Sequence, residues 1–398
     1  MAWANGSNQT LPAHSPLLHT LSDYVEMLIY CSLILLGVPV NVCTLRRVWR
    51  RYAATKARIF LLHINLNLSD ILILSFHASY RVGWIYTYEW HGGEVLCRLL
   101  KFLNNLGIAF SSNVIVAIGF DRLSSLNPSL TTMERMQRVH WSLRVAWLFA
   151  IFTSLPNLLL WEVVEVEGLP GFHQCISIFK AFRLNYRPVS SSPFTEDGLV
   201  VLEFAWSLAN VLCNFWLPAL IISICYSIIL WQVYDKLGSD GKDVQIIHYS
   251  SRPGQRPELC RGKEKCASSS SSSAALARRG QRQASSSPSY RTSLTIAQQR
   301  AASLDCSERS LRIRRRKYQT LVMTLVLVCA YVACWLPYNA LLVWQMAAPA
   351  SYQRHEDYLY FLYGLIVANS VINPFIYARG GHLPSLPSMA SCTGLASD

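Results

Sequence analysis

The sequence contains little charge for its length. Only 15% of its 398 residues are Asp, Glu, Lys or Arg, whereas an ordinary soluble domain has about a quarter. It does contain 52% hydrophobic residues, with 12 tryptophans and 19 tyrosines. This balance excludes the two or three soluble domains that the length alone would suggest. It indicates a chain that is largely surrounded by lipid.

Two further absences narrow the class of protein. The first 24 residues hold no Lys or Arg and no continuous apolar core, so we expect no cleavable signal peptide and expect the first membrane span to act as the targeting signal. The apolar segments contain neither a Gly-x-Ser-Gly sequence nor a histidine pair with metal-ligand spacing. An enzyme working inside the membrane is therefore not expected.

The apolar residues form seven blocks that are long enough for a helix to cross about 30 Å of hydrocarbon. Several blocks contain Pro or Gly, which membrane helices tolerate. We therefore predict an all-α fold, a bundle of seven transmembrane helices. The predicted spans are Val25–Val48, Ile59–Tyr80, Cys97–Leu123, Trp141–Trp161, Leu199–Tyr234, Tyr318–Met346 and Tyr358–Tyr377.

The positions of the basic residues predict how the bundle is oriented. The connections after spans one, three and five, together with the tail, hold 29 of the 36 Lys and Arg residues that give a formal net charge of +13. Basic loops stay in the cytoplasm, so the N-terminus is predicted to be extracellular and the C-terminus cytoplasmic. The glycosylation sequons at Asn5 and Asn8 agree. This distribution leaves nucleic acid with no site to bind.

The predicted organisation has five segments. They are a glycosylated extracellular N-terminus (1–24), helices one to five (25–234), a disordered basic Ser-rich third cytoplasmic loop (235–317), helices six and seven (318–377) and a short cytoplasmic tail (378–398). The loop has six consecutive serines and few large apolar residues, so it cannot bury a core. Arg-x-x-Ser sequences make Ser285 and Ser303 candidate phosphorylation sites. A basic run before span six is expected to contact anionic membrane lipid.

Ionisable residues inside the spans are candidates for a functional role, because a charge at mid-bilayer has a high free-energy cost. Asp70 lies in the middle of span two, and Asp121 with Arg122 closes span three. The uncharged polar residues at depth are Asn41, Asn369, Ser370 and Asn373. Any one of them could simply form a hydrogen bond between two helices. Their occurrence together, at defined spacings, favours a functional role.

Motifs in all seven spans, in order, resemble those of the rhodopsin-like (class A) G-protein-coupled receptors. Arg122 follows Cys97 by 25 residues, which is the spacing of that family. A match in every span is far more specific than any single motif. The matching residues are Gly37 and Asn41, Leu66 and Asp70, Cys97, Asp121-Arg122-Leu123, Trp147, Pro218 and Tyr226, Cys334-Trp335-Leu336-Pro337, and Asn373-Pro374-Phe375-Ile376-Tyr377.

The resemblance implies a disulfide bond and an ion site. Cys97 and Cys175 would both face the oxidising exterior, where their bond would hold the second outer loop across the bundle. An allosteric sodium ion is implied because hard cations prefer oxygen ligands, and no other cofactor is expected. The implied sodium ligands are Asp70, Ser111, Asn369, Ser370 and Asn373.

The resemblance also implies an activation switch. Asp121 would neutralise Arg122 in the resting receptor, and Arg122 would turn towards Tyr226 and Tyr377 when a cytoplasmic cleft opens for a heterotrimeric G protein. The complete set of implied switch residues is Asp121, Arg122, Tyr226, Trp335, Pro337, Asn373, Pro374 and Tyr377. Further implied partners are arrestin and receptor kinases, and the implied location is the plasma membrane.

Two absences exclude classes of ligand. Amine receptors carry an Asp seven residues after the cysteine of span three, where this sequence has Asn104. Opsins carry a retinal-linked Lys seven residues before the proline of span seven, where this sequence has Val367. Amines and retinal are therefore not expected as ligands.

A narrower resemblance, to receptors for gonadotropin-releasing hormone and adipokinetic hormone, predicts a peptide ligand. It rests on Trp84, Trp90, Gly92-Gly93-Glu94-Val95-Leu96-Cys97, and Cys334-Trp335-Leu336-Pro337-Tyr338 with Leu341 and Trp344. The alternative is that these aromatic residues form an interfacial belt. Arg81 and Asn104 depart from the acid and the lysine of mammalian relatives, which predicts a peptide with an acidic group facing Arg81. The predicted ligand contacts are Arg81, Trp84, Asn104, Tyr338, Asn339 and Trp344.

The segment after Tyr377 departs from the family pattern. Its two glycines and a proline cannot form the amphipathic helix usual at that place, which suggests a truncated or alternatively spliced form. The predicted function is a receptor, not an enzyme, for a neuropeptide or peptide hormone that activates a G protein. The alternatives are a class A receptor for another peptide or small ligand, a non-signalling receptor form, and a transporter or channel.

Overall fold

The computed structural model describes residues 19–166, 169–184, 186, 196–249, 319, 321–355 and 359–379. The predicted sites that lie outside these residues are Asn5, Asn8, Ser285 and Ser303. The chain forms two units, one of Met1–Trp231 with Gln319–Asp398 and one of Gln232–Tyr318. The helix bundle belongs to the first unit. Nearly all of the second unit lies outside the described residues.

The described elements are almost all helices. In chain order they are α1 (Leu21–Thr55), α2 (Arg58–Leu72), η1 (Ile73–Ala78), α3 (Ser79–Thr87), α4 (Gly93–Leu126), α5 (Thr132–Ser154), α6 (Asn157–Leu160), β1 (Trp161–Glu165), β2 (His173–Ser177), α7 (Ile178–Arg183), α8 (Glu196–Val211), η3 (Leu212–Trp216), α9 (Leu217–Tyr249), the helix Leu321–Ala347, α11 (Pro349–Gln353), η4 (Tyr360–Tyr363) and α13 (Gly364–Arg379). We call Leu321–Ala347 the span-six helix.

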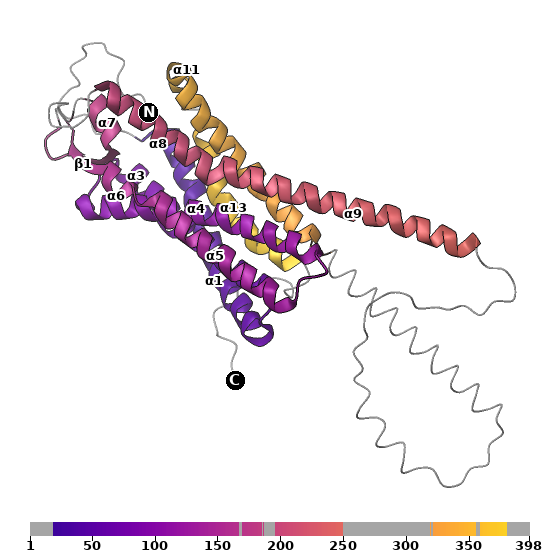
Figure 1. Ribbon diagram of the computed structural model, residues 1–398. Helices are drawn as coiled ribbons and strands as arrows, with labels where there is room; N and C mark the ends of the chain where they lie inside the picture. Colours follow the sequence, from indigo (N-terminus) through magenta and orange to yellow (C-terminus); the bar gives the residue numbers. More distant parts are fainter. Residues whose placement is uncertain are drawn as a thin grey trace, which may run out of the picture. The chain divides into compact units, whose positions relative to one another are not determined.

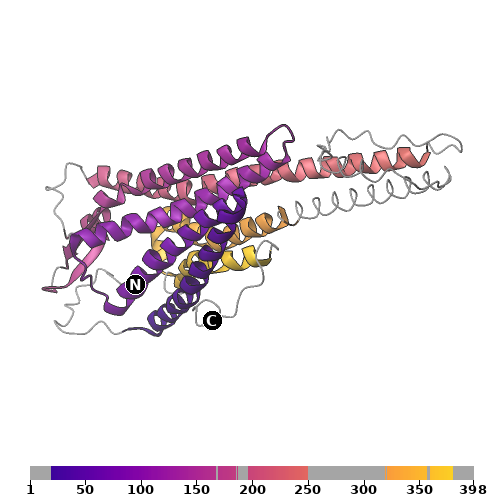
Figure 2. The same cartoon turned by 90° about the horizontal axis from the view of Figure 1, so that it is seen from below.

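Six helices are long and apolar enough to cross a membrane, and a shorter seventh is also apolar. The six are Leu21–Thr55, Arg58–Thr87, Gly93–Leu126, Thr132–Leu160, Asp197–Asp235 and Leu321–Ala347, and the seventh is Phe361–Ile376. α4 packs against α5, whereas α1 packs against α2 and α13. Figure 1 shows β1 of the hairpin and α7 together at one end, and Figure 2 shows the same helices from below. The prediction of seven spans is confirmed.

The start of α5 differs from the predicted boundary of span four. Thr131 caps this helix through a capping box with Glu134, so the helix begins nine residues before the apolar block that predicts span four. Hydropathy locates the part of a helix that lies in lipid, whereas a capping box locates the first hydrogen-bonded turn. Thr20 and Asp23 form a second capping box at the start of α1.

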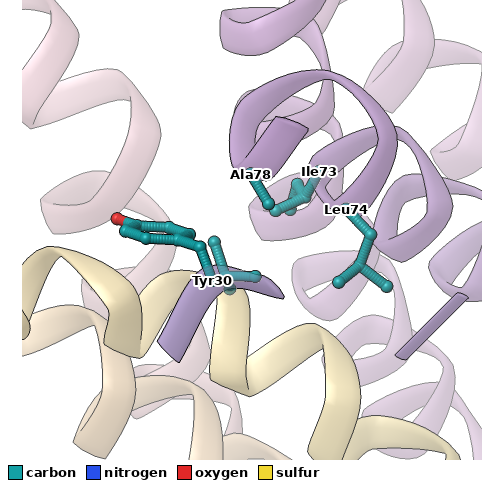
Figure 3. Close-up of a cluster of buried hydrophobic side chains, with 5 residues drawn as sticks. Tyr30, Ile73, Leu74 and Ala78 are labelled. Atoms are coloured by element: carbon teal, nitrogen blue, oxygen red, sulfur yellow. The ribbon is translucent and has the colours of Figure 1, made fainter. Parts of the chain in front are cut away.

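Two of the spans are interrupted by a π-helical turn. In span two, η1 joins α2 to α3, and in span five, η3 joins α8 to α9. Figure 3 shows the packing at η1, where the Tyr30 side chain of α1 lies beside Ile73, Leu74 and Ala78, with its hydroxyl directed away from them. Such turns shift the helix face that follows them and often occur near functional sites.

Helices one, two and seven approach closely at a glycine and are joined by amides. A Cβ at Gly37 would lie 2.8 Å from Val371 and 2.9 Å from Leu74, so only glycine fits there. Asn41 donates from Nδ2 to the backbone carbonyls of Gly37 at 2.9 Å and Ser370 at 3.0 Å. Its Oδ1 accepts from Asn67 at 2.8 Å. This asparagine therefore connects three helices.

The only strands in the described part of the chain form an antiparallel hairpin in the second outer loop. β1 pairs with β2 so that Val163 lies opposite Cys175. Cys175 is bonded to Cys97 of α4, with 5.8 Å between the Cα atoms. The predicted disulfide is confirmed, and it fixes the hairpin to the outer end of span three.

Residues 235–317 are predicted to form a disordered loop, and the structure describes the first part of this segment as helix. α9 continues as a helix to Tyr249, well past the apolar block of span five. Residues 235–249 contain no proline, and extending an existing helix is much easier than starting one. The remainder of that segment, apart from the boundary with span six, lies outside the described residues, as do residues 380–398.

Candidate ligand-binding and signalling site

A buried ion pair joins α1 to α3 at the outer end of the bundle. Arg81 donates from Nε and Nη2 to the two carboxylate oxygens of Glu26, at 2.7 Å and 3.1 Å. The carboxylate side chain is 5% exposed and the arginine side chain 31%. The guanidinium group also lies 5.1 Å from the ring of Trp84. The sequence predicts that Arg81 faces an acidic group of the ligand, and in the structure Arg81 is paired with a carboxylate of the chain itself.

Lys101 is a second cation at this end, and it is held by aromatic rings. Its ammonium nitrogen lies 3.8 Å from the ring centre of Tyr80 and 4.0 Å from that of Trp161. Both distances are within the range of a cation–π interaction. Among the described residues, no carboxylate forms a salt bridge with it. Lys101 therefore has no carboxylate partner among the described residues, whereas Arg81 has one.

The hairpin is held over this region by side-chain contacts as well as by the disulfide. Trp84 donates from its indole nitrogen to Gln174 of β2 at 3.2 Å, and Gln174 in turn donates to the carbonyl of Tyr88. Glu94 of α4 accepts from the backbone nitrogen of Val163 at 2.7 Å. These hydrogen bonds thus join α3, α4 and the hairpin to one another at the outer end of the bundle.

The outer ends of α1 and α3 are joined a second time. The hydroxyl of Tyr88, which follows α3, donates to Asp23 at 2.5 Å. Burial, followed by this hydrogen bond and the charge of Asp23, raises the pKa of Tyr88. The hydroxyl therefore remains a proton donor at neutral pH. This second contact reinforces the attachment made by the ion pair.

The predicted ligand contacts on span six form a separate aromatic group. Tyr338 contacts the ring of Tyr363 edge-on, with 5.5 Å between centroids, and Trp344 contacts Tyr352 at 6.1 Å. The hydroxyls of Tyr352 and Tyr363 are hydrogen-bonded, which joins the two pairs. Asn339 is buried and donates to the backbone carbonyl of Trp335 within its own helix, at 2.9 Å.

Asn104, the remaining predicted contact, lies on α4 next to His77 of η1. Of the six predicted contacts, Arg81 and Trp84 touch each other, and Tyr338 and Trp344 are linked through tyrosines. Tyr30 of α1 interacts electrostatically with both Arg81 and Tyr338.

The polar residues predicted to hold sodium lie together in the middle of the bundle. Asp70, Ser111, Asn369, Ser370 and Asn373 are all completely buried. Asn373 donates from Nδ2 to the two carboxylate oxygens of Asp70, at 3.0 Å and 3.1 Å. The Ser111 hydroxyl, both side-chain polar atoms of Asn369 and the Asn373 Oδ1 have no hydrogen-bond partner among the described residues. Buried polar atoms normally have partners, so these orphaned oxygens fit the donor set of a hydrated hard cation.

At the cytoplasmic end, one carboxylate is shared by two arginines. Asp121 accepts from Arg122 through one oxygen and from Arg58, the first residue of α2, through the other. Arg58 also donates to the Ser125 hydroxyl at 2.8 Å. The side chains of Asp121 and Arg122 are 1% and 9% exposed. This pairing is the resting arrangement that the sequence predicts, with a second arginine that it does not.

The other predicted switch residues lie within helices. Trp335 is 1% exposed, and its ring lies 5.2 Å from that of Tyr331 one turn away. Tyr226 is buried and interacts electrostatically with Arg122, and Pro374 lies inside α13. The side chain of Tyr377 lies outside the described residues.

The chain matches the family described as "7 transmembrane receptor (rhodopsin family)" over residues 40–377. It belongs to the rhodopsin family of receptors. It is 30% identical over 397 residues to "G-protein coupled receptor daf-38" of Caenorhabditis elegans, covering 92% of this chain and 91% of the relative. The mouse vasopressin V1b receptor is 26% identical over 93% of this chain and 76% of its own, and the human V2 receptor 26% identical over 89% and 81%.

Membership of the rhodopsin family establishes several of the predictions. The protein is a class A G-protein-coupled receptor, not an enzyme, and spans the plasma membrane several times. The narrower resemblance to receptors for gonadotropin-releasing hormone and adipokinetic hormone is not supported, since the relatives above are vasopressin receptors and daf-38. The short aromatic motifs that suggested that subgroup do not discriminate between subgroups of this receptor family.

The sequence did not lead us to predict three charged residues of the site, which are Glu26, Lys101 and Arg58. For Glu26 and Lys101, their position inside a span could have indicated a role. Glu26 lies within the first span, and Lys101 lies one turn after Cys97 in the third. The rule that an ionisable residue in a span needs a reason identifies both. Arg58 lies at the edge of span two, where basic residues are common, so nothing in the sequence separates it from an ordinary positive-inside charge.

Proposed function

We propose that this receptor binds a peptide at its outer end and activates a heterotrimeric G protein at its cytoplasmic end. The observation that carries this proposal is the side chain of Lys101, whose amino group lies against the rings of Tyr80 and Trp161, close to the Glu26–Arg81 pair, and has no carboxylate partner among the described residues. Charged groups at this depth are costly unless they have a partner. A peptide, with its carbonyl groups and acidic side chains, is the class of ligand that can supply one.

The relatives support a peptide as the ligand class. The vasopressin receptors are named for a peptide hormone, and their similarity covers about nine tenths of this chain. Of the ligand contacts predicted from the sequence, Arg81, Trp84 and Asn104 surround the region of Lys101 on spans two and three. In this proposal Lys101 contacts the ligand directly, whereas Arg81 positions α3 against α1.

The resting state would be held at two places along the bundle. Asp70, Ser111, Asn369 and Asn373 would hold a sodium ion, whose charge would be balanced by the carboxylate. At the cytoplasmic end Asp121 would hold Arg122 through the hydrogen bond between them. An agonist that favours the other arrangement would release Arg122 and expose the surface that binds the G protein. This is a two-state equilibrium biased by a ligand, as allostery requires.

The proposal is tested by a ligand screen in transfected cells. Cells that express the receptor are exposed to synthetic neuropeptides and, in parallel, to small anionic compounds, with calcium and cyclic AMP as readouts. A peptide that acts on the receptor and loses at least tenfold in potency on Lys101→Gln supports the proposal. An agonist found only among the small compounds, or a peptide whose potency is unchanged by Lys101→Gln, contradicts it.

A further inference from the structure

Helix α1 continues past the hydrocarbon core on the cytoplasmic side. It runs for 35 residues and ends at Thr55, which corresponds to about 52 Å at 1.5 Å per residue, whereas the hydrocarbon core of a bilayer is about 30 Å thick. The apolar block that predicts span one ends at Val48, seven residues earlier. The last two turns of α1 therefore lie at the level of the lipid headgroups or beyond them.

The side of α1 that faces lipid leads to two arginines at this end. Leu28 and Leu35 are 68% and 72% exposed, as side chains in contact with lipid tails are. Arg46 lies eighteen residues after Leu28, about five full turns, and therefore on the same side of the helix. Trp49 and Arg50, one turn further on, are exposed as well. We call Arg46, Trp49 and Arg50 the basic stripe.

The basic stripe points away from the rest of the bundle. Thr44 and Val48 lie on the opposite side of the same turns and are 4% and 0% exposed. With its buried side, α1 packs against α2 and α13. The side chains of Arg46 and Arg50 are thus directed towards the lipid that surrounds the bundle, and not into the space between the helices.

Neither arginine of the basic stripe has a carboxylate partner in the described part of the chain. No Asp or Glu occurs between Glu26 and Asp70, and the salt bridges of the described residues involve other basic side chains. Arg58, eight residues after the stripe, shows the contrast, because it is paired with a carboxylate. A guanidinium group stays charged. Arg46 and Arg50 therefore leave two positive charges for an anion that the described residues do not supply.

We propose that the basic stripe is a binding site for one anionic phospholipid of the cytoplasmic leaflet. Arg46 and Arg50 are one helical turn apart, so both guanidinium groups can donate to the phosphate group of a single lipid. Trp49 belongs to the same side of the helix, and tryptophan side chains are enriched at the interface between lipid tails and water. The proposal does not depend on the proposed peptide ligand or on signalling to a G protein.

A lipid matches the stripe better than a soluble anion does. The tails of a lipid bound at Arg46 and Arg50 also contact the exposed apolar side chains that precede the stripe on α1, such as Leu35. The cytoplasmic leaflet carries a negative surface potential, which attracts basic residues next to a span. A soluble phosphate ion has only the two guanidinium groups to bind.

The test uses the purified full-length receptor in phosphatidylcholine nanodiscs with a trace of a phospholipid probe, which carries a photoactivatable group beside its phosphate. One probe is phosphatidylserine and the other is phosphatidylcholine, and mass spectrometry measures the labelling of the peptide that contains Trp49. One arginine near an anionic lipid surface corresponds to about a fivefold change in affinity. In the wild-type receptor the serine probe is therefore expected to label this peptide roughly tenfold more than the choline probe, or better.

Three double variants locate the binding to the stripe. Arg46→Gln with Arg50→Gln is expected to reduce labelling by the serine probe about 25-fold. Lys56→Gln with Arg138→Gln is the matched control, because it removes the same charge from exposed cytoplasmic positions outside the stripe, and its labelling stays at the wild-type level. Arg46→Lys with Arg50→Lys keeps the charge and most of the labelling. Melting temperatures in phosphatidylcholine alone check that each variant is folded.

Several outcomes would overturn the proposal. Equal labelling by the two probes in the wild-type receptor refutes the site without any variant. Wild-type labelling in the glutamine variant of the stripe refutes it too, as does an equal loss in the control, since the general charge of the cytoplasmic side would then explain the labelling. Inorganic phosphate in large excess is expected not to displace the serine probe. Displacement would show that the stripe binds a soluble anion and not a lipid.

Discussion

The ion pair between Glu26 and Arg81 can be tested by removing each charge in turn. Both side chains are largely buried, and two hydrogen bonds join them. Breaking a buried pair costs about 3–5 kcal/mol, and the partial exposure of Arg81 reduces this to about 2–3 kcal/mol. The two variants are not equivalent. A lone carboxyl group can take up a proton, whereas a guanidinium group stays charged. Glu26→Gln should therefore destabilise the receptor more than Arg81→Gln.

The assay is thermal unfolding of the purified receptor in lipid nanodiscs. With roughly 1–2 °C per kcal/mol for a chain of this size, Glu26→Gln lowers the melting temperature by about 2–6 °C. Arg98→Gln is the control, since Arg98 pairs with Glu94 one turn away on an exposed surface, a contact worth about 0.5 kcal/mol or less. The charge-exchanged double variant, Glu26→Arg with Arg81→Glu, recovers part of the loss.

Two results would refute this reasoning. The first is a melting temperature of Glu26→Gln within the change caused by Arg98→Gln. The second is additivity, in which the double variant with glutamine at both positions loses as much as the two single variants together. Residues in contact are coupled, and additivity would mean that the two side chains do not interact in the native receptor.

The remaining predictions concern the other charges of the site. Lys101→Gln weakens a peptide agonist at least tenfold, about 1.4 kcal/mol, while Lys56→Gln on the cytoplasmic side leaves its potency unchanged; equal effects would contradict a direct ligand contact. Asp70→Ala removes the sodium sensitivity of agonist binding, and sensitivity retained in this variant would exclude the site. Arg58→Gln lowers basal signalling about twofold or more, because both carboxylate oxygens of Asp121 are then free to pair with Arg122. A rise in basal signalling would instead show that Arg58 helps to hold the resting state.

The fold could be predicted from the sequence because its determinants are local. A block of about 20 apolar residues requires a helix in lipid, whatever surrounds it. The disulfide could also be predicted, because Cys97 and Cys175 both lie in segments predicted to be extracellular and the resemblance to class A receptors implies a bond between them. The capping box at Thr131 is also a local feature of the sequence. It sets the first residue of α5, which hydropathy alone does not indicate.

The pairing of charges could not be predicted, since it depends on how distant segments pack. Arg81 finds its partner 55 residues earlier, and Arg58 finds Asp121 63 residues later. Sequence alone shows that Arg81 is charged and outside, which leaves a ligand and an internal carboxylate equally possible as partners.

The central claim is that Arg122 transmits a signal from an outer ligand to a G protein. The most direct measurement is agonist-stimulated nucleotide exchange on a purified G protein, with the wild-type receptor and Arg122→Ala at equal agonist occupancy. Arg122→Ala is expected to bind the agonist and to lose the stimulated exchange. Stimulated exchange at the wild-type rate in Arg122→Ala would contradict the proposed role of Arg122.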